Sequence, residues 1–180
     1  MTYYRDKSKR CMTASGPHVR AIGWLDKKHR FRKGRTSLEF REKLRKFSES
    51  ASSSTFSLGW GVFFGHHTCE LCEKFSSGLN FGVPAGEILY VAPEMVSHYV
   101  ENHRYRPPKE FVKAVLDSPL PDTREYSDAI ARFRRPDDQP AGYGTEGYDP
   151  AQAGDSSQVT SARTEANGVW NKILRILSRS

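Results

Sequence analysis

The chain has 180 residues, of which 37% are hydrophobic and 27% are charged, and its formal net charge is +7 at pH 7. A chain of this length predicts one domain with tails, large enough to bury a core. Three cysteines are too few for a disulfide framework, the polar start MTYYRDKSKR predicts no signal peptide, and no apolar run reaches membrane-spanning length, so we expect a soluble cytoplasmic protein.

The positive charge is concentrated in residues 1–50, which hold 15 Lys or Arg against 5 Asp or Glu. Residues 1–17 are charged and poor in apolar side chains, which predicts a disordered basic arm with Cys11 as an exposed thiol. An excess of positive charge can attract nucleic acid, and a solvated basic face explains it equally well.

The folded domain is predicted to span residues 18–133, beginning with a short strand in which Val19 and Ala21 alternate with polar positions. A capping pattern at Thr36 and Glu39 then predicts a helix. Its apolar residues recur at i, i+4 and i+7 and form one buried stripe, which consists of Phe40, Leu44 and Phe47.

The other faces of this helix are basic, and they carry Arg41, Lys43, Arg45 and Lys46. The four side chains make the helix the candidate binding surface for a polyanion such as nucleic acid. A solvated outer face is the alternative interpretation of the same charge run.

Two pairs of metal-ligand residues lie between positions 65 and 108. Cys69 and Cys72 are spaced C-x2-C, and His98 and His103 follow as H-x4-H after a loop of 25 residues. The pairs are typical of tetrahedral zinc, but the loop is longer than the roughly 12–15 residues of a nucleic-acid-binding finger. The pattern therefore predicts a Zn²⁺ site built into a small globular domain.

The sequence leaves two candidates for the fourth ligand, His103 and His67. On a regular helix, His98 and His103 would point about 140° apart, so they can share an ion only if the helix unwinds after Asn102. His67, in H-x-C-x-x-C, is the substitute. With one helical histidine alone the zinc would keep an open position, at which Glu94 could act as a base.

In the second half of the domain, an apolar run predicts a buried strand at residues 88–91, and the following pattern predicts helices separated by prolines. The first helix starts at Pro93 and ends at residues 102–103, the next follows the Pro107–Pro108 pair, and another follows Asp122. The fold class is therefore a compact α+β domain with short strands and three to four helices around a zinc knuckle.

Residues 134–168 are rich in Pro, Gly, Asp, Ser and Gln, which predicts a disordered linker. Residues 169–180 predict an amphipathic C-terminal helix whose apolar face consists of Trp170, Ile173, Leu174 and Leu177. Because a helix this short is marginal alone, we expect it to dock on a protein partner or on its own domain, with weak peripheral membrane contact as the alternative.

Five pieces of the chain carry a resemblance: AIGWL, GHHTCELC, NFGVP, ILYVAPEMVSHYVENHRYRPPKEF and AVLDSPLPDTREY. The chain resembles a family of small uncharacterised bacterial proteins in which an H-x-C-x-x-C knuckle is followed by a YVAPE…HY…H…Y-x-PP segment. The resemblance covers residues 19–132, leaves out the arm, the linker and the terminal helix, and implies a fold and a site without an activity. Its implied motif residues are His67, Cys69, Cys72, Glu94, His98, His103, Pro107 and Pro108.

These patterns favour a zinc-stabilised binding or adaptor module over an enzyme. We expect a protein partner, with nucleic acid as the second candidate through the basic N-terminal half. The alternative is a small metal-dependent hydrolase that uses Glu94 and an open zinc position. The sequence contains no phosphate-cradling glycine loop, HExxH or GxSxG motif, so it names neither substrate nor partner.

Overall fold

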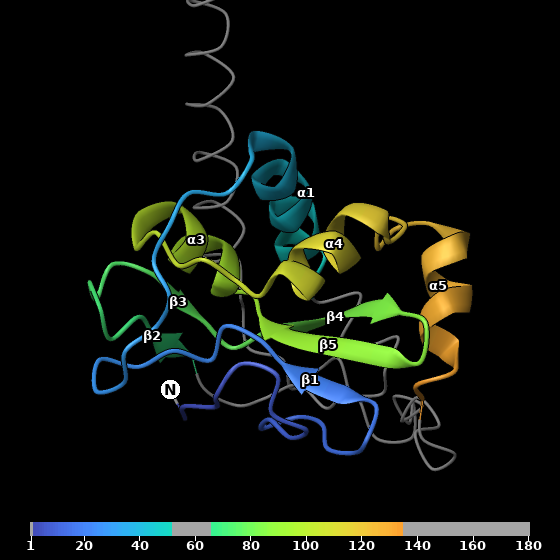
Figure 1. The fold of residues 1–180 in the computed structure, drawn as a ribbon, viewed down its shortest axis with the longest axis horizontal. Coiled ribbons are helices and arrows are strands. Elements are labelled where there is room, and N and C mark those ends of the chain that lie inside the picture. Colours follow the sequence, from blue (N-terminus) through green and yellow to red (C-terminus); the bar gives the residue numbers. More distant parts are fainter. Residues whose placement is uncertain (1, 52–65, 135–180) are drawn as a thin grey trace, which may run out of the picture. The chain divides into compact units, whose positions relative to one another are not determined.

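The computed structural model describes residues 2–51 and 66–134, which belong to the unit Met1–Ala141. Within these residues, a three-stranded sheet, a two-stranded hairpin and four α-helices form a small α+β domain, as predicted (Figure 1). Beyond Arg134, the predicted linker and the C-terminal helix with Trp170, Ile173, Leu174 and Leu177 lie outside the described residues.

The three-stranded sheet has the order β1-β5-β4. Strand β1 (Val19–Ala21) runs parallel to β5 (Ile88–Pro93), and β5 pairs antiparallel with β4 (Asn80–Ala85). Strand β5 lies in the middle of the sheet and is buried from its second residue onward, which explains its nearly unbroken apolar sequence. The strand predicted at residues 88–91 is therefore confirmed.

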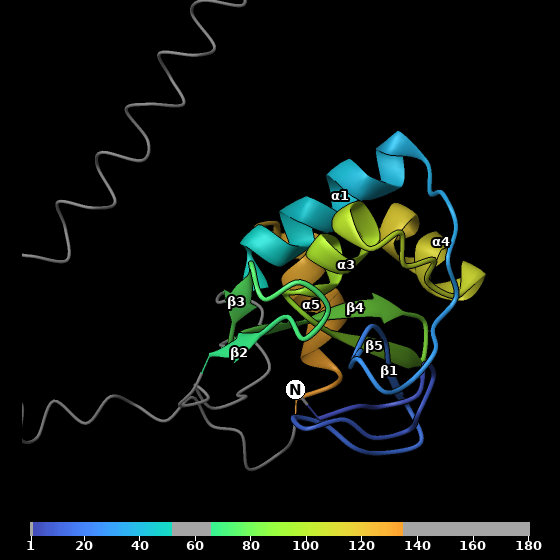
Figure 2. The ribbon, with the colours of Figure 1, turned by 90° about the vertical axis from the view of Figure 1, so that its left-hand side faces the viewer.

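The helices pack on the sheet and on one another. They are α1 (Leu38–Glu49), α3 (Val96–Asn102), α4 (Lys109–Asp117) and α5 (Arg124–Ala131). Helix α1 contacts α3, α4 and β4, whereas α5 contacts β4 (Figures 1 and 2). In this part of the chain, no helix is long and apolar enough to cross a bilayer.

The core of α1 agrees with the predicted stripe, because Phe40 is fully buried together with the other two stripe residues. The helix starts differ from the predicted ones. The cap of α1 is Ser37, whose hydroxyl accepts the N–H of Phe40, rather than Thr36. Helix α3 begins at Val96 instead of Pro93, because Pro93 is still paired in β5.

The N-terminal segment is part of the folded domain, which corrects the predicted disordered arm for residues 2–17. The N–H of Lys7 donates to the carbonyl of Ala21 at 2.7 Å, and the N–H of Ala21 donates back to Ser8 at 2.8 Å. These bonds cover the outer edge of β1. Cys11 is 7% exposed rather than a free surface thiol. The segment is held by backbone pairing, which an apolar pattern does not predict.

The carboxylate of Asp6 also joins this segment to the domain. Oδ1 of Asp6 accepts the N–H of Gly23 at 3.1 Å and the hydroxyl of Tyr105 at 2.8 Å. Tyr105 is fully buried, so its hydroxyl needs such a partner. Asp6 therefore links the N-terminal segment, the end of β1 and the segment after α3.

Buried aromatic side chains connect the rest of the core in the same way. The indole N–H of Trp24 donates to the carbonyl of Val91 at 3.3 Å, and the hydroxyl of Tyr126 on α5 donates to the carbonyl of Gly82 on β4 at 2.7 Å. Each ring contributes apolar burial while its polar atom remains hydrogen-bonded. On α3, which carries the candidate site, the hydroxyl of the buried Tyr99 donates in the same way to the carbonyl of Leu25 at 3.4 Å.

We predict that Gly23→Ala destabilises the domain much more than Gly86→Ala. Both glycines have positive φ, 71° and 55°, but a Cβ on Gly23 would lie 2.5 Å from Cγ2 of the buried Val96, whereas a Cβ on Gly86 meets nothing within 4 Å. The backbone conformation costs each variant about 1–2 kcal/mol, and overpacking adds about 1–3 kcal/mol at Gly23 alone. Urea unfolding measures both, and equal losses of unfolding free energy would contradict the prediction.

Candidate metal centre

The two cysteines lie in the turn of a very short hairpin. Strands β2 (His67–Thr68) and β3 (Ser76–Ser77) pair antiparallel on either side of this turn. The N–H of Cys69 donates to the carbonyl of Phe75 at 2.8 Å, and the N–H of Glu73 donates back to the carbonyl of Cys69 at the same distance. These two bonds close the turn that carries both thiols.

The two histidines come from α3 and the residue that follows it. His98 lies within the helix, and His103 is the first residue after its end. The N–H groups of His103 and Tyr105 both donate to the carbonyl of Tyr99, and Arg104 adopts a left-handed φ of 55°. The helix therefore ends after Asn102, which is the condition that the sequence sets for the two histidines to converge. The chain reverses its direction at Arg104.

The four ligand atoms converge on one point. The Nε2 atoms of His98 and His103 are 3.1 Å apart, Sγ of Cys69 lies 3.4 Å from His103, and Sγ of Cys72 lies 3.3 Å from His98. All four atoms lie within 4.8 Å of one another. Tetrahedral zinc, with Zn–S of about 2.3 Å and Zn–N of about 2.0–2.1 Å, places sulfur and nitrogen about 3.6 Å apart and two nitrogens about 3.3 Å apart. The cluster fits a metal ion with these bond lengths.

The environment of Cys69 is that of a ligand sulfur. The residue is fully buried, and burial raises the pKa of its thiol. The backbone N–H groups of Leu71 and Cys72 act in the opposite direction, because they donate to the sulfur and favour the thiolate. A bound cation would supply the remaining stabilisation of the negative charge.

Both histidines are held in the form that binds metal. Burial, and then the positive field of His103, lower the pKa of His98, while burial and then Lys33 lower the pKa of His103. The ring of Phe75 stacks on His98 with centroids 5.0 Å apart and an interplanar angle of 12°, and the side chain of Asn102 lies near enough to the same imidazole to act against this lowering of its pKa. These contacts fix the orientation of the ligand.

The sequence analysis did not single out Phe75 or Asn102. Asn102 could have been found, because it lies four residues after His98 and therefore on the same face of α3. Phe75 carries no comparable signal, since its contact with His98 depends on how the hairpin folds against the helix.

The substitute ligand His67 lies elsewhere. Its side chain lines a small cavity with Met12, Trp24 and Met95, and it does not belong to the group of four ligand atoms. Between the two candidates left open by the sequence, the structure brings His103 to the cysteines.

Glu94, the candidate catalytic base, is engaged in another contact. Its carboxylate accepts the hydroxyl of the buried Ser77 on β3, and the hydroxyl of Ser77 in turn accepts the N–H of Leu79. The backbone N–H of Glu94 donates to the carbonyl of Leu79 at 2.9 Å. Glu94 thereby ties the hairpin to the start of α3, and it is not one of the four converging residues.

The predicted basic face of α1 is divided. Arg45 and Lys46 are exposed, whereas Arg41 and Lys43 are half-buried. The ammonium of Lys43 donates to the carbonyl of Leu116 at 2.6 Å, in the last turn of α4, where a cation is favourable. Of the four basic residues, Lys43 is therefore bound to α4, and only Arg45 and Lys46 are fully exposed.

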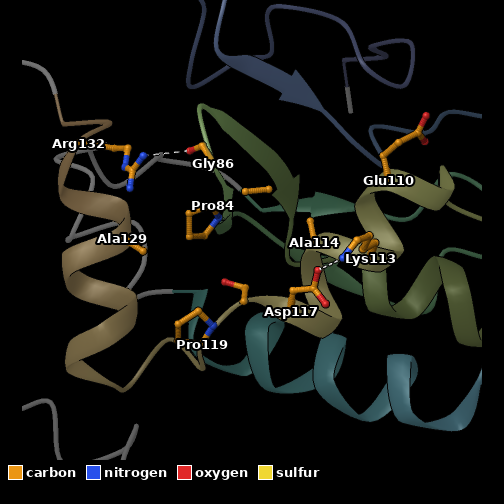
Figure 3. Close-up of a pocket in the computed structure, with 11 residues that line it drawn as sticks. Pro84, Gly86, Glu110, Lys113, Ala114, Asp117, Pro119, Ala129 and Arg132 are labelled. Atoms are coloured by element: carbon orange, nitrogen blue, oxygen red, sulfur yellow. Dashed lines mark hydrogen bonds and ion pairs between the residues drawn. The ribbon is translucent and has the colours of Figure 1, made fainter.

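A cavity of about 490 Å³ lies apart from the cluster, between the β4–β5 turn, α4 and α5. Figure 3 shows that Lys113 and Asp117 pair with each other across its wall and that Arg132 reaches the carbonyl of Gly86. Its other labelled lining residues include Pro84 and Pro119. None of the residues that line this cavity belongs to the Cys/His cluster.

We predict that His103→Ala abolishes stoichiometric metal binding, whereas His67→Ala leaves the metal content unchanged. Of these two histidines, only His103 contributes an atom to the cluster. Loss of one of the four ligands would open the site to solvent. Elemental analysis of the two purified variants provides the measurement. Metal lost from His67→Ala but retained by His103→Ala would reverse the assignment of the fourth ligand.

We also predict that zinc affinity rises with pH. Thiols lose protons when they bind metal, and the raised pKa of Cys69 keeps that proton in place through the neutral range. The pKa values of His98 and His103 lie below the ordinary 6.5, so above that pH their rings are neutral and add no pH dependence. Chelator competition should show the association constant increasing about 10- to 100-fold per pH unit between about pH 6.5 and 8. A flat profile would contradict thiolate ligation.

Comparison with known protein families matches residues 2–116 to a family described as a domain of unknown function, DUF7919. The match includes the N-terminal segment, which the sequence resemblance left out, and it contains the whole Cys/His cluster. Searches of curated proteins and of solved structures find no match. Because the matched region covers more than half of the chain, this protein belongs to the DUF7919 family.

Proposed function

We propose that the protein is a zinc-stabilised binding module in which the metal has a structural role. One observation carries the proposal: two sulfurs from a hairpin turn and two Nε2 atoms from the end of α3 converge within 4.8 Å. A Cys₂His₂ set with tetrahedral spacing is the ligand chemistry that zinc prefers, because soft thiolates and imidazoles both suit this ion.

The ligand count supports a structural site over a catalytic one. Catalytic zinc keeps one position for water or substrate, whereas four protein ligands complete the coordination. The hydrolase alternative needs Glu94 beside an open zinc position, but the carboxylate of Glu94 accepts the hydroxyl of Ser77. We therefore propose a binding function and assign Glu94 to holding the hairpin.

Zinc would make a large contribution to the stability of the hairpin. Strands β2 and β3 have two residues each, and an isolated hairpin of this size is not stable in water. Ligation by His98 and His103 would fasten it to α3. Since the site forms only in the folded chain, the free energy of metal binding becomes free energy of folding.

A protein partner remains a prediction. The apolar helix of this chain that would bind it, at residues 169–180, lies outside the described residues. Nucleic acid, the second candidate, is supported by the excess of basic residues in positions 1–50, although α1 exposes only Arg45 and Lys46 of its four predicted contacts. A surface that binds nucleic acid would therefore need basic residues outside α1.

Metal dependence is tested with Cys72→Ser and a matched control, Cys11→Ser. Cys11 is also buried, but its sulfur contacts Thr13 and the carbonyl of Ala14, bonds that a serine hydroxyl can replace. We expect the wild type and Cys11→Ser to hold about one zinc per chain and Cys72→Ser to hold none. Chelation should lower the unfolding temperature of the first two proteins and leave Cys72→Ser unchanged.

The decisive measurement is the metal content and the stability of the wild-type protein. If it were purified free of metal, folded, and unchanged in stability by added zinc, the proposed role of the metal would be wrong. Hydrolysis that required an intact Glu94 in zinc-loaded protein would instead favour the enzyme.

A further inference from the structure

Two basic segments that are far apart in the sequence pair with each other. The N–H of Gly34 donates to the carbonyl of Arg104 at 2.9 Å, and the N–H of Arg106 donates to the carbonyl of Arg32 at 2.8 Å. Residues 32–34 and 104–106 thus form a short antiparallel ribbon, with Lys33 opposite Tyr105. We call these six residues the basic ribbon.

One face of the basic ribbon is made of arginines. With Lys33 opposite Tyr105, the antiparallel register places Arg32 opposite Arg106, and both are exposed. Gly34 allows this arrangement, because a Cβ there would lie 2.7 Å from Cδ of Arg106. Like charges directly opposite each other destabilise a strand pair unless an anion lies between them. The arrangement is therefore better suited to a bound state than to the free protein.

These arginines are not neutralised by the rest of the described chain. The salt bridges in residues 2–51 and 66–134 use other cations: Lys7, His29, Lys113, Arg124 and Arg132. Arg32 acts on Glu110 through its field rather than through a salt bridge. The basic ribbon consequently presents uncompensated positive charge, to which a polyanion is complementary.

A cleft of about 450 Å³ adjoins the basic ribbon and adds aromatic rings to the charge. Its lining includes the rings of Tyr3 and Phe31 and the cations Arg5, Arg30 and Lys109. Arg32 belongs to both the cleft and the basic ribbon, so the two form one continuous surface. No sequence pattern predicts this combination, because its rings and cations come from three separate segments.

The two carboxylates of the cleft have partners already. Asp6 accepts hydrogen bonds from Gly23 and Tyr105, and Glu110 pairs with Lys7 at 3.3 Å. The three cations Arg5, Arg30 and Lys109 are exposed. The cleft therefore keeps a net positive charge next to apolar ring surface.

We propose that the basic ribbon and this cleft bind single-stranded nucleic acid. The planar guanidinium groups of Arg32, Arg104 and Arg106 suit phosphate oxygens. The ring of Tyr3 stacks on His29 with centroids 3.8 Å apart, and an unpaired base would extend this stack. Phe31 adds apolar surface, with the ammonium of Lys33 over its ring. The combination of a cationic track with recessed rings distinguishes a single strand from a duplex, whose bases remain stacked inside the helix. It also distinguishes a nucleic acid from polyphosphate, which has no bases.

This inference deepens the proposed binding function and rests on it, because the metal centre would anchor one strand of the ribbon. His103, a proposed ligand, directly precedes Arg104. Lys33, from the other strand, pairs with Tyr105, two residues after His103. A ligated His103 would hold the 104–106 strand against residues 32–34.

The test measures binding of a labelled oligonucleotide of about 12 nucleotides to the zinc-loaded full chain by fluorescence anisotropy. With about four phosphate contacts, the logarithm of the association constant should fall with a slope of about −3 against the logarithm of salt concentration. The double variant Arg32→Gln/Arg106→Gln should bind at least about 10-fold more weakly, and the slope should become about 1.4 units less steep, because two contacts are lost.

The matched control is Arg45→Gln/Lys46→Gln on α1. It removes the same charge from exposed positions of the helix that the sequence analysis favoured. We expect its affinity to stay within about twofold of wild type, since only the overall charge has changed. Equal losses in the two double variants would overturn the assignment of the surface.

The role of the rings is tested separately with Tyr3→Leu, which keeps apolar bulk but removes the stacking surface. Binding of the oligonucleotide should weaken about fivefold or more, while binding of polyphosphate should not change. Tighter binding of a duplex of equal length, or of polyphosphate, than of the single strand would overturn the proposal.

Metal content measured on the same samples separates the two proposals. Zinc-loaded protein that fails to bind the oligonucleotide at about 50 mM salt overturns this inference and leaves the structural role of zinc intact. Stable metal-free protein that binds the strand with the predicted losses overturns the role of zinc and leaves the nucleic-acid surface intact.

Discussion

The rest of the site depends on four ligand atoms meeting between a hairpin turn and the end of a helix. Strands β2 and β3 are too short to persist alone, and the ring of Phe75 against His98 is a small contact. Coordination of one cation by Cys69, Cys72, His98 and His103 would fix the hairpin at a point where little apolar burial is available. The proposed structural ion would therefore stabilise this part of the domain.

Four consecutive residues after α3 carry out different tasks. His103 turns toward the cysteines, Arg104 takes the left-handed conformation that permits this turn, and Tyr105 enters the core to reach Asp6. Arg106 then pairs with the segment around Arg32. Metal ligation, helix termination, core packing and surface charge are thus coupled within one short stretch. A change that disturbed His103 would be expected to affect the basic ribbon as well.

Few of the cations in the described domain form salt bridges, and the arginines of the basic ribbon are among the many that do not. The basic ribbon differs from the other cations in its geometry, because backbone pairing brings Arg32 opposite Arg106. This gathering of positive charge supports the proposed binding function.

The sequence by itself determined the features that depend on local pattern. Periodicity identified the buried stripe that includes Phe40, and ligand spacing identified the cysteines and histidines. The sequence could not decide whether His67 or His103 lies beside the cysteines, because that depends on the left-handed turn at Arg104 and on how the hairpin lies against α3. The ordered N-terminal segment and the pairing of residues 32–34 with 104–106 were decided by tertiary structure alone. Both rest on backbone hydrogen bonds between distant segments, and such bonds leave no periodic signal in side-chain type.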